Sequence, residues 1–171
     1  IVILNFGSQT CELIARRVRE CHVFSEVLSY DESIEEIKKR KPKGIILSGG
    51  PASVYEKDAP IPDPKILELG VPVLGICYGM QWFSQHLGGK VEKDTVSREF
   101  GKSQVTIKNF KSMFMGFDDH FIAWMSHGDT VTKLAPGFVS IGSTNSIENA
   151  AIANDAKKIY GLQFHPEVVH T

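Results

Sequence analysis

The chain has few cysteines, no long hydrophobic run and almost no net charge, and each shortage excludes a class of protein. Its three cysteines include no C-x-x-C pair, which argues against a disulfide framework and against a cysteine zinc site. Uninterrupted apolar runs reach about five residues, far below the ~20 that a membrane-spanning helix needs. The opening residues IVILNFG carry no basic segment, so we expect a strand there and no secretory signal peptide.

Charge and composition point to an ordinary globular protein. Nineteen basic and 20 acidic residues leave a net charge of −1, which gives no general attraction to nucleic acids or to anionic membranes. The content of 42% hydrophobic and 23% charged residues argues against disorder. A length of 171 residues matches a single domain. We therefore expect residues 1–171 to form one cytoplasmic domain that needs no metal or disulfide for stability, with neither a nucleic acid nor a membrane as partner.

The first half of the sequence alternates short aliphatic runs with amphipathic segments. Residues 1–4 form a continuous aliphatic run, as in a strand covered on both faces. Ser33 and Glu36 have the spacing of a capping box at the start of a helix. The pattern predicts strands at 1–4, 23–30, 44–47 and 71–76, and helices near 13–21, 33–40, 66–69 and 78–87.

The second half has a different pattern. Val105 and Ile107 alternate with polar residues, as do Val139 and Ile141, which predicts short strands, some of them antiparallel. The crossovers between the earlier strands are long enough for parallel pairing with helices on both sides. The fold class predicted from the whole pattern is α/β. It is an open, mostly parallel central sheet with helices on both faces and added short antiparallel strands.

The strongest local signal is the motif Gly75-Ile76-Cys77-Tyr78-Gly79, between a predicted strand and a predicted helix. In this context, Gly-x-nucleophile-x-Gly forms a nucleophile elbow. The two glycines lack the Cβ atoms that would clash in so sharp a turn. The N-terminus of the following helix favours a thiolate at Cys77. The alternative is an ordinary core cysteine in a glycine-flanked turn.

A cysteine nucleophile needs a base, and His165 is the best placed of the six histidines. It follows an apolar run, and in an extended chain His165 and Glu167 project from the same face. Pro166 between them discourages a helix. Glu167 could then orient the ring while the other ring nitrogen takes the proton of Cys77. Taken alone, a surface histidine near a glutamate is more often simply solvated.

Two further segments carry polar groups that fit a reaction centre. Residues 48–51, SGGP, follow a predicted strand, and the carboxyl ends of parallel strands form ligand crevices. A backbone N–H of this glycine loop could bind a developing oxyanion together with the N–H of Tyr78. The same residues are also common in plain turns. Residues 124–129, WMSHGD, follow an apolar run and by themselves predict only a helix start or a turn.

Several separated motifs resemble class I, triad-type glutamine amidotransferase domains. The superfamily is marked by GICYGMQ (75–81) and QFHPE (163–167). The amidotransferase domain of GMP synthetases is similar in NFGSQ, LIARRVRE, SGGPASVY and WMSHGD. Two positions depart from the family pattern: Asn5 stands where Asp is usual, and Thr10-Cys11 replaces an aromatic-led pair. We expect neither departure to touch the proposed triad.

The resemblance implies an enzyme that hydrolyses glutamine and supplies ammonia to a synthetase, which aminates XMP with ATP. Carried over by position, Cys77 is the nucleophile, His165 the general base and Glu167 its orienter. The other implied roles are oxyanion N–H donors at Gly50 and Tyr78, and glutamine-binding groups at Gln81, Ser126, Gly128 and Asp129. No metal or cofactor is implied in this domain, because ATP and Mg²⁺ are expected only in the partner.

The implied partners are L-glutamine and the ATP-pyrophosphatase domain or subunit of GMP synthetase, whose ATP-binding loop has no counterpart in the sequence. The chain is therefore expected to be an excised domain or a free-standing subunit. Three alternatives stay open: a glutaminase that serves another synthetase, a γ-glutamyl hydrolase-like cysteine hydrolase, and a non-catalytic interaction module. Residues 98–101, REFG, are expected in an exposed, solvated loop, with a contact to the partner as the alternative.

Overall fold

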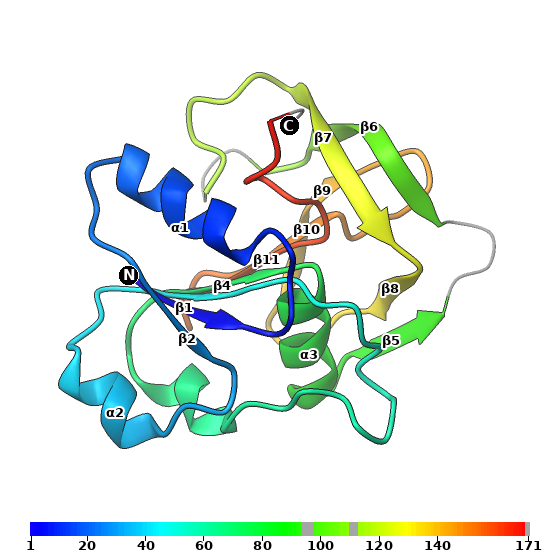
Figure 1. Cartoon of the computed structure of the whole chain (residues 1–171). Helices are drawn as coiled ribbons and strands as arrows, with labels where there is room; N and C mark the ends of the chain where they lie inside the picture. The colour runs from blue at the N-terminus through cyan, green and yellow to red at the C-terminus, as the bar shows by residue number, and fades with distance from the viewer. Residues whose placement is uncertain (94–97, 110–112, 170–171) are drawn as a thin grey trace.

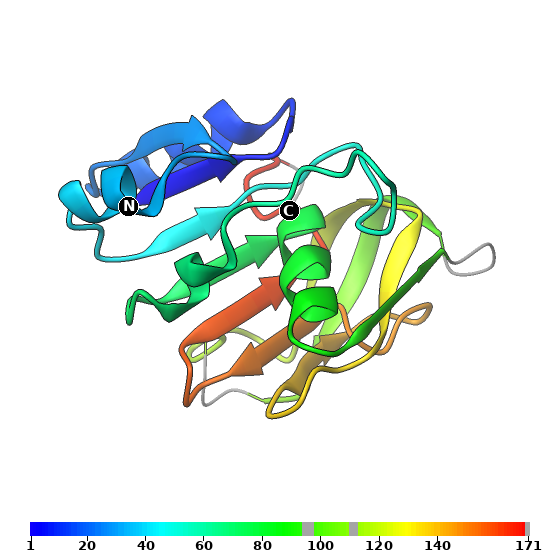
Figure 2. The same cartoon turned by 90° about the horizontal axis from the view of Figure 1, so that it is seen from below.

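A twisted sheet forms the centre of the molecule (Figures 1 and 2). The computed structural model describes residues 1–93, 98–109 and 113–169, and within them this sheet has nine strands in the order β2-β1-β3-β4-β11-β10-β9-β6-β7. A separate pair of strands, β5 and β8, packs against helix α3. The chain therefore builds one large sheet from both of its halves.

Five neighbouring strands of the large sheet run parallel. They are β2 (Glu26–Ser29), β1 (Val2–Asn5), β3 (Ile45–Leu47), β4 (Val73–Ile76) and β11 (Ile159–Leu162). The first four alternate with helices along the chain, so the predicted parallel sheet is confirmed. β11 comes from the far end of the sequence and pairs with β4, with Leu162 opposite Ile76. The residues that follow β4 and β11 therefore meet at one edge of the sheet.

The other side of the large sheet is antiparallel, as the alternating pattern predicts. Its strands are β10 (Ala151–Asn154), β9 (Val139–Ser143), β6 (Glu99–Ile107) and β7 (His120–His127). β6 and β7 span nine and eight residues, so they are longer than the short strands expected. The small sheet consists of β5 (Lys90–Lys93) and β8 (Asp129–Lys133).

The expectation of an exposed loop at residues 98–101 is wrong from Glu99 onward, because β6 begins there. Glu99 lies opposite His127 across the ladder and is 7% exposed, whereas Phe100 is 72% exposed. Successive side chains of a strand point to opposite faces, which is why a charged residue is buried beside an exposed aromatic one. Charge favours the solvent-exposed face, but at Glu99 the register of the strand and the pairing with His127 place the side chain on the buried face.

Helices cover both faces of the parallel half, as predicted (Figure 2). They are α1 (Cys11–Glu20), α2 (Ile34–Lys39) and α3 (Tyr78–His86), with the 3₁₀ helix η1 at Pro64–Glu68. α1 packs Ile14 and Ala15 into a core with Ile3 and Ile76. On the opposite face, α2, α3 and η1 enclose the largest hydrophobic core.

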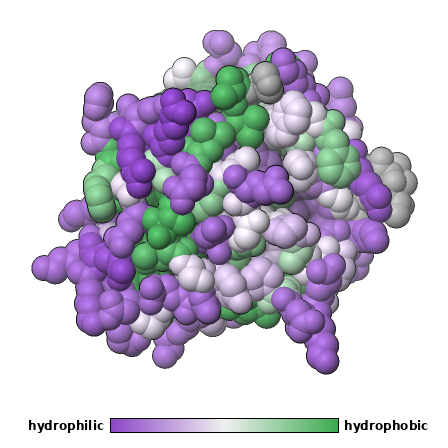
Figure 3. Space-filling model, in the orientation of Figure 1, coloured by the Kyte–Doolittle hydropathy of each residue, from purple (hydrophilic) through white to green (hydrophobic). Residues whose placement is uncertain are grey.

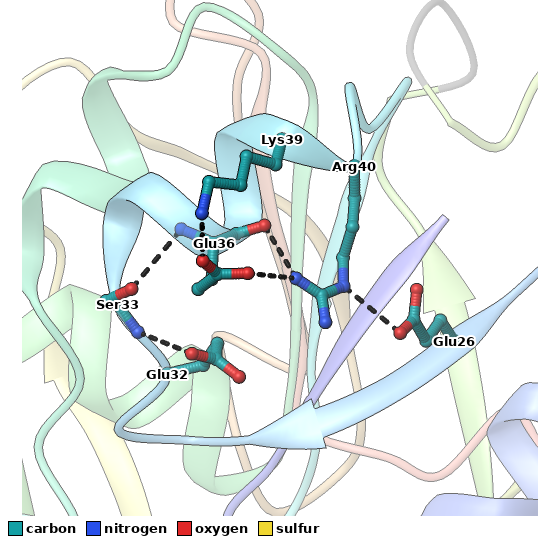
Figure 4. Close-up of polar contacts among 6 residues, drawn as sticks. All are labelled: Glu26, Glu32, Ser33, Glu36, Lys39 and Arg40. Atoms are coloured by element: carbon teal, nitrogen blue, oxygen red, sulfur yellow. Dashed lines mark hydrogen bonds and ion pairs between the residues drawn. The ribbon is translucent and has the colours of Figure 1, made fainter.

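The start of α2 is held by a side-chain cap, although the predicted capping box forms only in part. The Ser33 hydroxyl accepts a hydrogen bond from the Glu36 N–H at 3.2 Å. The Ser33 N–H donates to Glu32 rather than to Glu36 (3.0 Å). The Glu36 side chain instead pairs with Arg40, whose Nε also donates to Glu26 of β2 at 3.1 Å (Figure 4). The charges of α2 therefore tie the helix to the edge strand.

Hydrophilic residues cover most of the surface seen in Figure 3, and the hydrophobic ones on that face lie in small separate groups. Within the described ranges, none of the helices combines the length and the apolar character that a membrane crossing requires. Many of the apolar side chains of the parallel half lie between the sheet and its helices.

The packing of α3 on the sheet leads to a stability prediction. Phe83 is fully buried, and its ring stacks on that of Phe138 with 5.5 Å between centroids. Replacing Phe83 by Ala should lower the free energy of unfolding by about 3–5 kcal/mol, because the change leaves a cavity. Phe24, which is 78% exposed, is the matched control. Phe24→Ala should change the free energy of unfolding by less than about 0.5 kcal/mol. Urea unfolding of both variants measures this, and equal losses would contradict the assigned core.

Candidate active site

The turn between β4 and α3 has the geometry of a nucleophile elbow. Cys77 has φ +49° and ψ −104°, a conformation that side-chain-bearing residues rarely adopt. A Cβ atom at Gly75 would lie 2.5 Å from the Met80 nitrogen, and one at Gly79 would lie 2.5 Å from the Leu47 carbonyl oxygen. Both positions therefore require glycine, as the motif predicts.

The Cys77 sulfur faces a cavity rather than the open surface. Cys77 is 6% exposed, and it lines a cavity of about 670 Å³ at the sheet edge where β4 and β11 end. The sulfur lies 3.8 Å from the Ser126 carbonyl oxygen and accepts a hydrogen bond from Gln163 Nε2 at 3.6 Å. Cys77 is thus a buried residue, and its place in the lining of the cavity distinguishes it from an ordinary core cysteine.

His165 reaches Cys77 from the segment after β11. Its backbone N–H donates to the Trp124 carbonyl (2.9 Å). Its ring hydrogen-bonds to the Cys77 sulfur, and its Nδ1 lies 2.8 Å from Oε1 of Glu167. Burial by itself lowers the pKa of His165, but the contacts with Cys77 and Glu167 outweigh burial and raise the pKa to about 10. The ring therefore keeps its proton at neutral pH.

Glu167 is 2% exposed and is held from two sides. Its Oε1 accepts hydrogen bonds from His165 and from the Thr10 hydroxyl, the latter at 2.6 Å. Its backbone carbonyl accepts one from Arg17 Nε at 3.1 Å. The expectation that the Thr10-Cys11 departure does not touch the triad is therefore wrong for Thr10. Thr10 and Glu167 are 157 positions apart, so neither sequence segment alone could predict their contact.

The glycine loop after β3 lies against the elbow. The Ser48 carbonyl accepts from the Gly79 N–H at 3.1 Å, and the Ser48 hydroxyl accepts from the Phe6 N–H at 3.0 Å. Gly50 lines the cavity, and a Cβ atom there would lie 2.6 Å from the Phe6 carbonyl oxygen. A Cβ atom at Gly49 would lie 2.9 Å from the His165 ring. This backbone can approach the site only because both residues are glycine.

Tyr78, the second proposed oxyanion donor, is the first residue of α3, where an N–H has no intrahelical acceptor. Its side chain is fully buried, and its hydroxyl donates to the Pro60 carbonyl at 2.7 Å. The side chain lies outside the cavity, because Tyr78 is not among its lining residues. The role of its backbone N–H as an oxyanion donor stays a prediction.

The four proposed glutamine-binding residues all line the cavity: Gln81, Ser126, Gly128 and Asp129. They come from α3 and from the corner where β7 passes into β8, so WMSHGD is neither a helix start nor a plain turn. Gln81 Nε2 donates to the Asp129 carbonyl at 2.8 Å and to Gln163 Oε1 at 3.3 Å. An Asp129 carboxylate oxygen accepts from the Tyr55 hydroxyl at 2.8 Å. The amide nitrogen of Gln81 is therefore hydrogen-bonded within the protein.

Comparison with known proteins gives the family. The sequence model of the family "Glutamine amidotransferase class-I" matches residues 2–171. The chain belongs to the class I glutamine amidotransferases. Over all 171 residues, the chain is 56% identical to a protein of Caldanaerobacter subterraneus named GMP synthase [glutamine-hydrolyzing]. It is 54% identical over the same length to a protein of that name from Synechococcus sp. (strain CC9605). It spans about a third of the length of these relatives, 33% and 32%.

A solved structure resembles the amidotransferase chain over nearly its whole length. It is that of a putative GMP synthase subunit from Thermoplasma acidophilum, with a TM-score of 0.85 and 28% identity, covering 99% of this chain and 85% of that one. A glutamine amidotransferase of Thermotoga maritima, at 24% identity and a TM-score of 0.78, covers 98% of this chain and 76% of that one and supports the fold.

Several further side chains lie at the site that the sequence did not predict there. Gln163 is fully buried and contacts both Cys77 and Gln81. The loop at residues 7–10 lines the cavity and is shaped by the Asn5 side chain, which accepts from the N–H groups of Gly7 and Ser8. Except for Thr10, these residues lie within the motifs QFHPE and NFGSQ, but no sequence pattern predicted their contacts. Across the described ranges, no three metal-ligating side chains gather into a possible metal site.

The environments of the three cysteines predict a labelling pattern. With iodoacetamide near neutral pH, we expect alkylation of Cys77 and of the exposed Cys21. Cys11 should stay unlabelled, because burial raises the pKa of its thiol to about 11. His165→Gln should slow the labelling of Cys77 by about tenfold or more and leave Cys21 unchanged. Mass mapping gives all three rates in one sample. Faster labelling of Cys11 than of Cys77 would contradict the assigned environments.

Proposed function

We propose that this chain hydrolyses L-glutamine to glutamate and ammonia through a γ-glutamyl thioester on Cys77. The observation that carries the proposal is the meeting of an elbow cysteine with His165 and Glu167 in one cavity. Nucleophile, base and orienting carboxylate in hydrogen-bond contact are the arrangement that covalent acyl transfer needs. Membership of the class I glutamine amidotransferases supports the same reaction.

In the proposed first step, the Cys77 thiolate attacks the γ-carbonyl carbon of glutamine, and the carbonyl electron pair moves to oxygen. The N–H groups of Gly50 and Tyr78 would stabilise this oxyanion. When the intermediate collapses, the C–N bond breaks and His165 donates its proton to the leaving nitrogen, which departs as ammonia. The neutral imidazole then accepts a proton from the water that attacks the thioester. The C–S bond then breaks, which releases glutamate and regenerates the Cys77 thiolate.

Recognition of glutamine is assigned to Gln81, Ser126, Gly128 and Asp129. The carboxylate of Asp129 has the charge to attract the α-ammonium group of the substrate. Backbone groups at the β7–β8 corner can bind the rest of the amino-acid end. The cavity volume of about 670 Å³ lies within the usual range for a small-molecule site.

We assign the ammonia to a GMP synthetase, because the relatives named GMP synthase match the chain over all its 171 residues. In this assignment, residues 1–171 act as one glutaminase domain whose partner is an ATP-pyrophosphatase domain or subunit. That partner would use ATP and Mg²⁺ to aminate XMP. The amidotransferase domain itself would use no cofactor.

Three substitutions test the roles in glutamine hydrolysis. Cys77→Ala and His165→Ala should each lower kcat by about a thousandfold or more, because they remove the nucleophile and the base. Glu167→Gln should cost less, about 10- to 100-fold, since an orienting group is less essential than a base. Ammonia release from glutamine measures all three, and Cys21→Ala is the matched control with unchanged turnover. Turnover by Cys77→Ala would refute the thioester, and a Glu167→Gln loss equal to that of His165→Ala would revise the division of roles.

A partner experiment tests the assignment to GMP synthesis. Adding the cognate synthetase domain with XMP and ATP should raise glutamine hydrolysis by about tenfold or more, because ammonia production without an acceptor wastes glutamine. The same addition without XMP is the control. A response only to the synthetase of another pathway would identify a glutaminase with a different partner. Hydrolysis of γ-glutamyl peptides in place of glutamine would identify a γ-glutamyl hydrolase.

A further inference from the structure

A second buried histidine–carboxylate pair lies close to the cavity, and the proposed reaction does not use it. Nε2 of His127 lies 3.3 Å from Oε2 of Glu99, and the two residues face each other across the β6–β7 ladder. Their side chains are 1% and 7% exposed. His127 is also one of the residues that line the cavity.

Glu99 holds its charge in this buried place. Burial by itself raises the pKa of the Glu99 carboxyl, but hydrogen bonds from His127, Thr144 and Ser103 outweigh burial and lower it. Glu99 is therefore a carboxylate at neutral pH, held by side chains from β6, from β7 and from the segment after β9. These three hydrogen bonds fix the position of the Glu99 carboxylate within the sheet.

Stability alone does not account for this pair. His127 Nδ1 is buried and has no partner in the part of the chain that the structure describes. An unsatisfied buried polar atom costs free energy, and apolar pairs of similar volume are often as stable as buried ion pairs or more so. What the pair supplies beyond packing is a fixed, directional link between two strands.

That link acts on the corner between β7 and β8. His127 is flanked by Ser126, whose carbonyl contacts the Cys77 sulfur (3.8 Å), and by Gly128. Asp129 follows, bonded to Gln81 and Tyr55. The side chain of His127 is thus the buried anchor of a segment whose other residues face the cavity.

We propose that Glu99 is a positioning residue for glutamine, because through His127 it holds residues 126–129 in the place that binds the substrate. The inference rests on the proposed glutaminase function and adds to it a residue that does not touch the substrate. Removal of the Glu99 carboxylate should therefore weaken glutamine binding more than it slows the chemistry at Cys77.

The test compares Glu99→Ala with the 171-residue chain itself. We expect KM for glutamine to rise about tenfold while kcat stays within about threefold, the pattern of lost binding rather than lost chemistry. The glutamine concentration that half-protects Cys77 from iodoacetamide should rise by the same factor. Without glutamine, Cys77 should be alkylated at the unaltered rate. His120→Gln is the matched control, since His120 is an exposed histidine on the same strand that pairs with Asp119, and it should leave KM unchanged.

A double variant separates positioning from folding, which matters because removing one partner of a buried pair destabilises. Glu99→Met with His127→Leu should restore the urea midpoint of unfolding but keep the raised KM. A normal KM in Glu99→Ala, or a KM restored together with stability in the double variant, would overturn the inference. If the unaltered chain neither hydrolyses glutamine nor is protected by it, the proposed function fails, and this inference fails with it.

Discussion

The hydrogen bond from the Cys77 N–H to the Leu162 carbonyl, 2.7 Å long, continues the pairing of β4 with β11 past the end of β4. It joins two segments that are 85 residues apart in sequence, with Cys77 on one and His165 three residues beyond Leu162 on the other. Parallel strands end at the same edge of a sheet, so this register sets which side chains can meet. A slip by one residue would turn the neighbouring side chains to the opposite face and separate the sulfur from the imidazole.

The elbow adds a second constraint, because the strained backbone of Cys77 persists only where its surroundings fix it. Gly75 and Gly79 let α3 and β3 approach within distances that no Cβ atom allows. Ser48 then bonds to the Gly79 N–H and brings the glycine loop to the same place. Local close packing therefore places Cys77, the proposed nucleophile, while the long-range pairing of β4 with β11 brings His165, its proposed base, to the same edge of the sheet.

The contrast between these constraints explains how much could be predicted from the sequence. The strands β1, β3 and β4 were predictable because each is an apolar run, and the elbow because its glycine spacing is local. The contact of Thr10 with Glu167 was not, since it depends on how α1 lies over the site. The burial of Glu99 was missed for a different reason. A charged residue in an alternating strand faces the core or solvent according to register, which its own segment does not define.

Many of the buried polar side chains lie around the cavity. Gln81, Asp129 and Gln163 are bonded to one another or to the elbow, and each is at least nine-tenths buried. Within the described ranges, three buried side-chain atoms lack a partner, and His127 and Glu167 contribute two of them. Around α2, α3 and η1, the core is built from apolar side chains with ordinary packing. Since apolar pairs of similar volume are often as stable as buried polar pairs, stability alone does not explain the polar groups buried at this cavity.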